Sequence, residues 1–429
     1  MVSPCFIGVD IGTSGCRTVA ITENGRIVAS ARTNLPPPLR EVNRGVAQDP
    51  WVWWNVTTRV LRDLSAKLPP YRPTALCLDG TSSTLLLCTP DGDPLGPALM
   101  YNDTRSSAES ARIAQAAPAD SPARGASSSL AKALHLARHL QPPLGSRALH
   151  QADWLIGRLT GRFGVTDWNN ALKLGYDPLQ ECWPDWLEQL DLGPIALPLV
   201  LPPGTTIGKL DEEAALATGL PLGVPVAAGT TDSTAAVIAT GAQDEGDAVT
   251  CLGSTLVLKV VSRTSVSAPE YGVYSHRLGN LWLVGGASNS GGAVLRRFFT
   301  DAEMARMTCR LRPDEPTEFD YYPLLSPGER FPTADPHLPP RLSPRPSDDA
   351  RFFQGLLEGI AAIEARGYRL LQSLGAPPPT HVFSIGGGAN NLAWERIRRR
   401  MLGIPVTAAA VQEAAYGAAL LALRSMHQH

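Results

Sequence analysis

The chain carries almost no net charge, and it lacks long apolar runs. Its 38 Lys and Arg residues nearly balance its 40 Asp and Glu residues, which leaves a formal net charge of −2. No basic stripe interleaved with aromatic residues is present, so we expect no nucleic-acid partner. No stretch approaches the roughly 18–20 consecutive apolar residues that span a bilayer, so we expect no membrane partner either. These absences favour a small-molecule substrate.

Paired cysteines are also lacking. The seven cysteines are scattered, odd in number and without a C-x-x-C pair, which argues against a disulfide framework and against a zinc site. His135 and His139 have helical i, i+4 spacing, but they lack the H-E-x-x-H pattern and a third ligand, which favours packing over metal binding. An apolar strand begins at Cys5 with no leader-like segment ahead of it, so we expect a cytoplasmic protein.

The length of 429 residues exceeds what one hydrophobic core usually supports and predicts two domains with a cleft between them. The first thirty-odd residues predict an antiparallel meander with strands at 6–9, 17–22 and 27–33, because Asn24-Gly25 suits a tight hairpin. A helix capped by Asp49 follows. Next come a buried strand and a polar turn, which we expect at 75–78 and 79–83.

A similar series of elements restarts in the second half of the chain. We expect strands at 247–252, 256–261, 273–277 and 281–284, and helices at 291–299 and 350–374. Two copies of one βββαβα plan are the simplest interpretation. We place the boundary near 239–245, where an apolar helix ends at Thr240-Gly241.

Five glycine-rich junctions are the most informative feature of the sequence. They lie at residues 10–15, 229–233, 253–255, 285–292 and 386–391. Such turns offer backbone N–H groups and hydroxyl donors to an anion, although each also has a simpler interpretation as a hairpin or helix-capping turn. Their combination predicts ATP-dependent phosphoryl transfer.

Two carboxylates stand within these junctions. A buried strand delivers Asp10 to a tip where Gly12 and Thr13 follow, an arrangement that suits a metal-binding carboxylate beside phosphate donors. Asp232 precedes an apolar helix, so it is either an inert helix cap or a general base that accepts a substrate hydroxyl proton. The residues alone leave both roles open.

The remaining junctions suit other parts of a nucleotide. Gly253-Ser254-Thr255 could hold the far side of a triphosphate, and the three glycines of 386–388 let the backbone approach a base or ribose closely. The stretch that contains Gly291 offers another anion or nucleotide contact before a helix.

Taken together, these motifs resemble the FGGY carbohydrate kinases from residue 6 to about residue 420. The matching segments are Asp10-Ile-Gly-Thr-Ser14, Tyr101-Asn-Asp-Thr-Arg105, Thr166–Ala171, Gly229-Thr-Thr-Asp232, Gly253-Ser-Thr255 and Gly386–Asn391. The resemblance implies an α/β fold with two ribonuclease-H-like domains of the actin/Hsp70 ATPase type, whose cleft brings sugar and ATP together. We expect an N-terminal sugar-binding domain, 1–240, joined by a C-terminal helix, 413–429, and a nucleotide-binding domain, 241–412.

Within that family, the segments 79–87, 127–132, 151–154, 170–176 and 272–276 resemble a compact ribulose/xylulose kinase-like group of cyanobacteria and plants, which favours D-ribulose. The resemblance implies that Asp232 is the base and that Asp10 positions Mg²⁺. It implies phosphate contacts from Gly12, Thr13, Gly253, Ser254 and Thr255. It further implies adenosine contacts from Gly387, Gly388, Asn391 and Trp394, and sugar contacts from Asp10, Ser82, Asp103, Arg105 and Asp232.

The substrate and the assembly stay open at this point. The segment 79–82 departs from the Ser-Gly-Gln-Met-His typical of xylulose kinases, whereas the segment 102–105 is shared with them. D-xylulose, another polyol, and a nucleotide-gated sugar sensor with little turnover are therefore alternatives. The protein could be a monomer or a homodimer.

Overall fold

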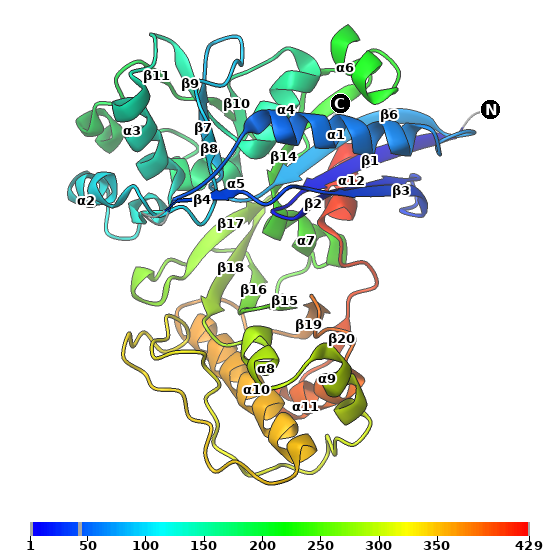
Figure 1. The fold of residues 1–429 in the computed structure, drawn as a ribbon, viewed down its shortest axis with the longest axis vertical. Helices are drawn as coiled ribbons and strands as arrows, with labels where there is room; N and C mark the ends of the chain where they lie inside the picture. Colours follow the sequence, from blue (N-terminus) through cyan, green and yellow to red (C-terminus); the bar gives the residue numbers. More distant parts are fainter. Residues whose placement is uncertain (1–2, 42–44, 428–429) are drawn as a thin grey trace. The chain divides into compact units, whose positions relative to one another are not determined.

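In a computed structural model, the described residues, 3–41 and 45–427, form two compact units (Figure 1). The first unit combines the chain up to Ala239 with the C-terminal segment from Glu413, and the second is Thr240–Gln412. Each unit is built around a six-stranded sheet.

The main sheet of the first unit begins with the predicted meander, which is confirmed. In sheet order its strands are β13 (Thr206–Lys209), β14 (Pro225–Thr231), β6 (Arg72–Gly80), β1 (Pro4–Ile11), β2 (Gly15–Ile21) and β3 (Ile27–Asn34). The strands β1, β2 and β3 are antiparallel neighbours, whereas β6 runs parallel to β1 and β14 runs parallel to β6. The carboxyl ends of β1, β6 and β14 therefore lie at one edge of the sheet.

The second unit repeats this order of strands. Its sheet runs β17 (Tyr274–Leu278), β18 (Leu281–Ser288), β16 (Leu256–Ser262), β15 (Asp247–Leu252), β19 (His381–Ile385) and β20 (Val406–Ala408). Here β15, β16 and β18 are antiparallel neighbours, and β19 and β20 continue the sheet in parallel from β15. The predicted repeat of one strand plan is present, with β17 as an additional edge strand.

Helices cover both sheets. Those of the first unit are α1 (Pro50–Ser65), α2 (Ser107–Ala116), α3 (Ser129–Leu140), α4 (Gln151–Thr160), α5 (Trp168–Ala171), α6 (Glu212–Thr218), α7 (Asp232–Thr240) and α12 (Ala414–Arg424). Those of the second are α8 (Gly292–Phe298), α9 (Asp301–Thr308), α10 (Asp349–Ser373) and α11 (Leu392–Leu402). Among the described residues no helix is both long and apolar enough to cross a membrane.

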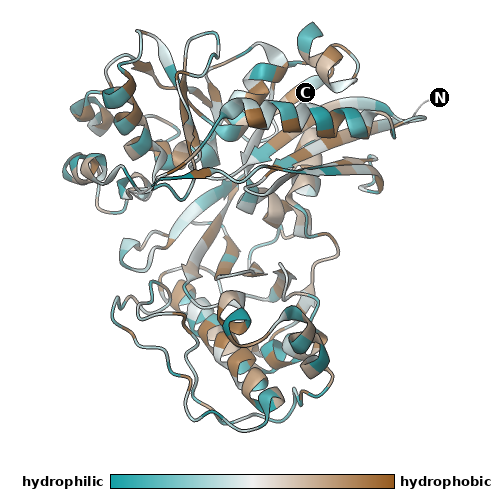
Figure 2. Cartoon of the chain, in the orientation of Figure 1, coloured by the Kyte–Doolittle hydropathy of each residue, from teal (hydrophilic) through white to brown (hydrophobic). Residues whose placement is uncertain are grey.

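The helix α1 shows how sequence signals act locally. The Asp49 side chain accepts a hydrogen bond from the Trp51 N–H, and Pro50 occupies the first turn, as predicted. Its buried residues, Trp53, Trp54, Val60, Leu61 and Leu64 among them, recur at helical spacing, and polar residues face the other side (Figure 2).

The C-terminal helix α12 packs against the first sheet through small residues. A Cβ at Gly8 of β1 would lie 1.9 Å from the Ala415 carbonyl oxygen, and a Cβ at Gly417 would lie 1.9 Å from that of Ala235. Only glycine permits such close backbone approach. The end of the chain thereby supports β1, the strand that carries Asp10.

The first unit also holds a second six-stranded sheet that the βββαβα plan did not include. Its order is β11 (Ile195–Ala196), β9 (Ser146–His150), β7 (Leu85–Cys88), β8 (Ala98–Leu99), β5 (Val46–Gln48) and β4 (Leu39–Arg40). The strands β10 (Val165–Asp167) and β12 (Leu199–Leu201) form a separate, parallel two-stranded sheet. An apolar cluster from α2, α3 and these strands forms a core of its own.

Two predicted turns are strand residues. Asp79 and Gly80 extend β6, because β1 pairs with both residues on one side and β14 does so on the other. Gly285 and Gly286 belong to β18, where they pair with β16, so the turn before α8 is confined to the residues around Gly291. In both cases pairing with distant strands overrides the local preference of glycine for turns.

Candidate active site

The first glycine turn follows β1 directly. Asp10 is 5% exposed near the strand end, and the Gly12 N–H donates to the Gly15 carbonyl oxygen at 3.0 Å to close the turn. Thr13 is half-buried and Ser14 is exposed, so their backbone and hydroxyl groups are accessible to a ligand. The predicted hairpin is confirmed, and its geometry suits an anion.

Asp79 stands in register with Asp10 on the neighbouring strand. Its side chain is fully buried, and no described N–H or hydroxyl group donates to its oxygens. Burial raises the pKa of Asp79 well above its usual value, and the charges of Asp10 and Asp232 raise it further. Burial also raises the pKa of Asp10, whereas the neighbouring Asp79 and the guanidinium of Arg17, at 3.4 Å, act to lower it. Asp79 therefore holds the proton of this pair, and Asp10 keeps the charge.

Asp232 opens α7 immediately after β14. The Ser233 N–H donates to its Oδ1 at 2.6 Å, and the side chain is half-buried. A bulge at Gly229, where a Cβ would lie 1.7 Å from the Leu78 carbonyl oxygen, brings β14 close to β6 before this point. The structure thus brings Asp232 to the same sheet edge as Asp79 and Asp10.

Ser82 lies half-buried on the turn after β6, and two side chains from other segments stabilise that turn. The Gln151 Oε1 accepts bonds from the Thr81 N–H at 3.0 Å and from its hydroxyl at 2.8 Å. The Lys132 ammonium donates to the Ser83 carbonyl oxygen at 2.7 Å. Gln151 and Lys132 were not among the predicted site residues, although the segments that contain them matched the family pattern.

Asp103 is fully buried, and the protein itself uses its carboxylate. Oδ2 accepts from the Val46 N–H at 2.6 Å and from the Arg105 Nε at 2.9 Å, and Oδ1 accepts from the Arg105 N–H. Arg105 also pairs with Glu41, and its Nη2 lies 2.3 Å from where a Cβ of Gly45 would stand. In this conformation Asp103 positions Arg105. Of these two predicted sugar contacts, Arg105 is the one with a donor, Nη2, that lacks a partner among the described residues.

Several buried polar atoms of the first unit lack a hydrogen-bond partner among the described residues. They include the Ser83 and Ser106 hydroxyls, Asn102 Oδ1, Arg105 Nη2, Gln151 Nε2 and both Asp79 oxygens. Because buried polar groups are nearly always paired, a set of orphans in linked segments indicates a ligand or water site. Donors and acceptors mixed in this way suit a polyhydroxylated molecule.

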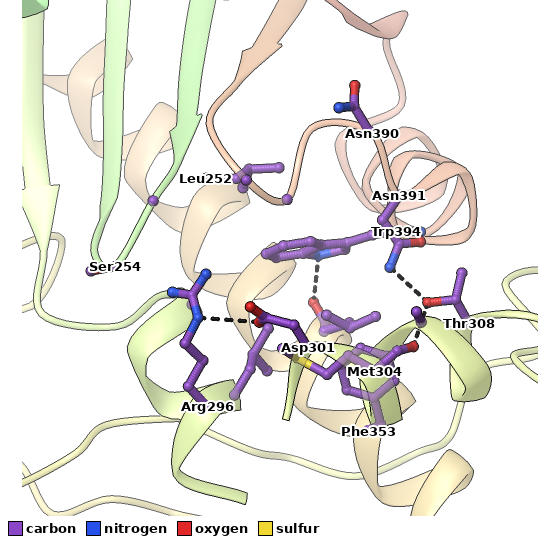
Figure 3. Close-up of a pocket in the computed structure, with 17 residues that line it drawn as sticks. Leu252, Ser254, Arg296, Asp301, Met304, Thr308, Phe353, Asn390, Asn391 and Trp394 are labelled. Atoms are coloured by element: carbon purple, nitrogen blue, oxygen red, sulfur yellow. Dashed lines mark hydrogen bonds and ion pairs between the residues drawn. The ribbon is translucent and has the colours of Figure 1, made fainter. Parts of the chain in front are cut away.

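The second unit contains a pocket of about 760 Å³ (Figure 3). Its lining residues are Leu252, Gly253, Ser254, Gly292, Leu295, Arg296, Asp301, Met304, Ala305, Thr308, Phe353, Leu357, Gly387, Gly388, Asn390, Asn391 and Trp394. Of the predicted nucleotide contacts in this unit, all but Thr255 and Gly291 line it. No sequence motif pointed to the lining residues Arg296, Asp301, Met304, Thr308 and Phe353.

Thr255 and Gly291 lie just behind the pocket wall. A Cβ at Gly291 would lie 2.7 Å from the Ser254 carbonyl oxygen and from the Thr255 Cα. The Gly292 N–H donates to the Gly253 carbonyl oxygen at 2.9 Å. Two predicted glycine junctions are thereby joined into one wall.

Trp394 and Asn391 are both held by the protein. The Trp394 indole donates to the Leu357 carbonyl oxygen at 3.1 Å, and a Cβ at Gly388 would lie 2.4 Å from its ring. Asn391 caps α11 through the Trp394 N–H, and its Nδ2 donates to the Thr308 hydroxyl at 3.2 Å. The apolar side of the pocket is therefore rigidly built, which suits a flat ring system.

The histidine pair is placed as the sequence suggested. His135 and His139 lie on α3 with ring centroids 4.0 Å apart, and His135 lies 3.6 Å from Glu109. Within the described chain no group of three or more His, Cys, Asp or Glu side chains is arranged to hold a metal ion. A magnesium ion at Asp10 would thus need ligands from a bound nucleotide or water.

Comparison with known proteins agrees with this geometry. The models of the N-terminal and C-terminal domains of the FGGY family of carbohydrate kinases match residues 5–124 and 248–426. The chain is 28% identical to the xylulose kinase of Escherichia coli K12 over 91% of its length and 84% of that protein. It is also 30% identical to part of an erythritol kinase of Brucella abortus, over 55% of this chain and 48% of that protein.

Solved structures confirm the predicted fold. A xylulose kinase from Rhodospirillum rubrum superposes with a TM-score of 0.86 at 25% identity, over 97% of this chain and 89% of that one. A Plasmodium falciparum glycerol kinase with ADP gives a TM-score of 0.87 at 17% identity, over 99% and 90% of the two chains, and shows the fold alone. The two units have the sugar-kinase architecture of the actin/Hsp70 type. The chain belongs to the FGGY family of ATP-dependent carbohydrate kinases.

Proposed function

We propose that the protein transfers the γ-phosphoryl group of ATP to the terminal hydroxyl of a ketopentose, with D-ribulose as the expected substrate and D-ribulose 5-phosphate as the product. The observation that carries the proposal is the convergence of Asp10, Asp79 and Asp232 at the ends of β1, β6 and β14. A phosphate-type turn, Gly12–Gly15, continues from the same edge. Carboxylates beside anion-binding turns are what phosphoryl transfer requires.

Asp232 is the proposed general base. As the sugar oxygen forms its bond to the γ-phosphorus, the hydroxyl proton passes to the Asp232 carboxylate, the bond to the β,γ-bridging oxygen breaks, and ADP leaves. The Ser233 N–H bond fixes one carboxylate oxygen at the start of α7. Because the transition state is loose, such positioning supplies much of the acceleration.

Asp10 is the proposed residue for Mg²⁺. It keeps its charge beside a protonated Asp79, and it lies at the mouth of the phosphate turn. Magnesium sites in kinases use one or two carboxylates together with substrate phosphates and water, so this donor set fits the ion. When bound, Mg²⁺ offsets the negative charge of the phosphates.

The pocket of the second unit is the proposed ATP site. Leu357, Phe353 and Trp394 provide an apolar wall for the base, and Gly253, Ser254 and Gly387 bring backbone groups to the phosphates. A volume of about 760 Å³ is sufficient for a nucleotide.

The choice of sugar depends on the first unit. Ser82, Asn102, Arg105 and Gln151 offer unpartnered or accessible polar atoms for sugar hydroxyls. The segment after β6 differs from the pattern typical of xylulose kinases, which favours D-ribulose. D-xylulose is the second candidate, because the relatives include proteins named xylulose kinase.

A coupled ADP-release assay with Mg-ATP tests the proposal over D-ribulose, D-xylulose, pentitols, hexoses and glycerol. The highest kcat/KM with D-ribulose supports the proposed substrate. A preference for D-xylulose or a pentitol would change the proposed substrate and leave the proposed phosphoryl transfer unchanged. Tight ADP binding without turnover on any sugar overturns the kinase assignment in favour of a nucleotide-gated sensor.

A further inference from the structure

Arg296 of α8 reaches into the pocket of the second unit with most of its donors unused (Figure 3). Its Nε donates to the Asp301 Oδ1 at 3.3 Å. Among the described residues, neither Nη1 nor Nη2 makes a hydrogen bond. The guanidinium is therefore held at one edge and open at the other.

The open edge faces two glycine turns. A Cβ at Gly292 would lie 3.8 Å from Nη1 of Arg296, and a Cβ at Gly387 would lie 4.0 Å from Nη2. Gly292 begins α8 and Gly387 follows β19, so turns from two distant segments meet at this guanidinium. In neither turn does a side chain separate the backbone from the two terminal amino groups.

Arg296 is also the one cation among the described residues that line the pocket, and Asp301 is the one anion. Their side chains are 54% and 78% exposed, so the ion pair adds little to the stability of the fold. Figure 3 shows Arg296 on the Ser254 side of the pocket, whereas Asn391 and Thr308 lie on the other side. The pocket thus has a cationic end and a largely apolar remainder.

We propose that Arg296 binds the phosphates of the nucleotide through Nη1 and Nη2, and that Asp301 is the residue that positions it. The inference rests on the proposed ATP site. A planar guanidinium anchored through Nε presents two parallel N–H donors, which match two phosphate oxygens in a bidentate contact. No bond is made or broken in this step.

The experiment measures nucleotide affinity by calorimetry on the full chain, without sugar, for ADP and for adenosine. Arg296→Gln should raise the Kd for ADP about 10- to 100-fold, the range that charge-assisted hydrogen bonds give, and leave the Kd for adenosine unchanged. Arg297→Gln is the matched control, because Arg297 is the next residue of α8, contacts the Leu325 carbonyl oxygen and does not line the pocket. It should leave both affinities unchanged.

Asp301 is tested by rescue. Asp301→Ala should weaken ADP binding roughly 3- to 10-fold, whereas Asp301→Asn, which keeps an oxygen for the Arg296 Nε, should restore most of the affinity. In the Arg296→Gln background, Asp301→Ala should have no further effect, because a positioning residue acts only through its partner.

The outcomes separate this inference from the proposed function. Suppose that the wild-type protein binds ADP. If Arg296→Gln binds ADP equally well, or if its affinity for adenosine falls as much as its affinity for ADP, the phosphate role of Arg296 is overturned and the ATP site stands. If the wild-type protein binds neither ADP nor adenosine, the ATP site and the role of Arg296 are overturned together.

Discussion

Asp79 lies opposite Asp10 on the adjacent parallel strand, and both carboxyl groups are buried. Burial and the nearby negative charges raise the pKa of Asp79 well above its usual value, so Asp79 is the neutral member. A protonated acid behind a charged one fixes the orientation of the outer carboxylate without adding a second charge.

The first prediction compares two substitutions in this pair. Asp79→Asn should keep kcat within about 10-fold of wild type, because an amide is neutral and offers a hydrogen-bond donor to the neighbouring Asp10. Asp10→Asn should lower kcat by about 10²–10³-fold, because it removes the charge itself. Steady-state kinetics at pH 7.5 on the preferred sugar measures both. Equal losses would show that both carboxylates act in the charged form.

The second prediction concerns Lys132, which is fully buried below the turn that carries Ser82. Burial lowers its pKa to about 7, against a contribution from Asp103 that raises it. Between pH 7 and its ordinary pKa the unfolded chain binds one more proton than the folded protein, so stability rises with pH in that range. The rise is as much as ~5 kcal/mol over the whole window.

Chemical denaturation from pH 7 to pH 9 of the wild type and of Lys132→Met measures this effect. Buried thiols such as Cys16, whose pKa is raised by burial, begin to lose their protons in the unfolded chain toward pH 9, but this contribution is the same in both proteins and cancels in the comparison. The wild-type free energy of unfolding should rise relative to that of the variant. Lys209→Met, at an exposed strand position, is the control and should show the wild-type slope. A slope unchanged in Lys132→Met would mean that Lys132 stays charged.

The third prediction concerns the core of the second unit. Arg398 of α11 makes two bonds to the Glu364 carboxylate of α10, at 2.6 and 2.7 Å, and both side chains are buried. Glu364 also accepts from the Thr250 hydroxyl, and Arg398 donates to the Ser384 hydroxyl. The network therefore links two strands with two helices, and removing one partner leaves a buried charge unpaired.

Glu364→Gln should lower the free energy of unfolding of the second unit by about 3–5 kcal/mol. Glu315→Gln removes an exposed ion pair with Arg312 and should change it by less than about 1 kcal/mol. Urea denaturation followed by Trp fluorescence compares them, with a separate transition allowed for each unit. Similar losses of unfolding free energy in both variants would show that the buried ion pair contributes no more to stability than the exposed one.

The elements that were predicted correctly have local signals. Asn24-Gly25 and the alternating residues around it define the first hairpin, and Asp49 with Pro50 defines the start of α1. The second sheet of the first unit was missed, because several of its strands are only two or three residues long and their partners are far away in sequence. Asp79 was placed in a turn for the same reason, since β1 and β14 hold it in a strand.

Prediction of the site shows the same limit. Asp10 and Asp232 stand within glycine turns that mark them in the sequence. Arg296 has no such mark, because an arginine on a helix is usually solvated, and only the approach of Gly387 distinguishes it. The use of the Asp103 carboxylate by Val46 likewise depends on a backbone group 57 residues away.

The last prediction concerns Asp232. Asp232→Ala should lower kcat by roughly 10²–10⁴-fold, the usual contribution of a general base, and leave the Kd for ADP unchanged, because the proposed ATP pocket lies in the second unit and is not lined by Asp232. Asp63→Asn, an exposed aspartate of α1, is the control and should keep wild-type kinetics. The coupled assay and calorimetry measure the two quantities. Normal turnover by Asp232→Ala would leave Asp232 as a helix cap, and an equal loss of ADP affinity would point to a structural role, because a base that acts only on the sugar hydroxyl has no contact with ADP to lose.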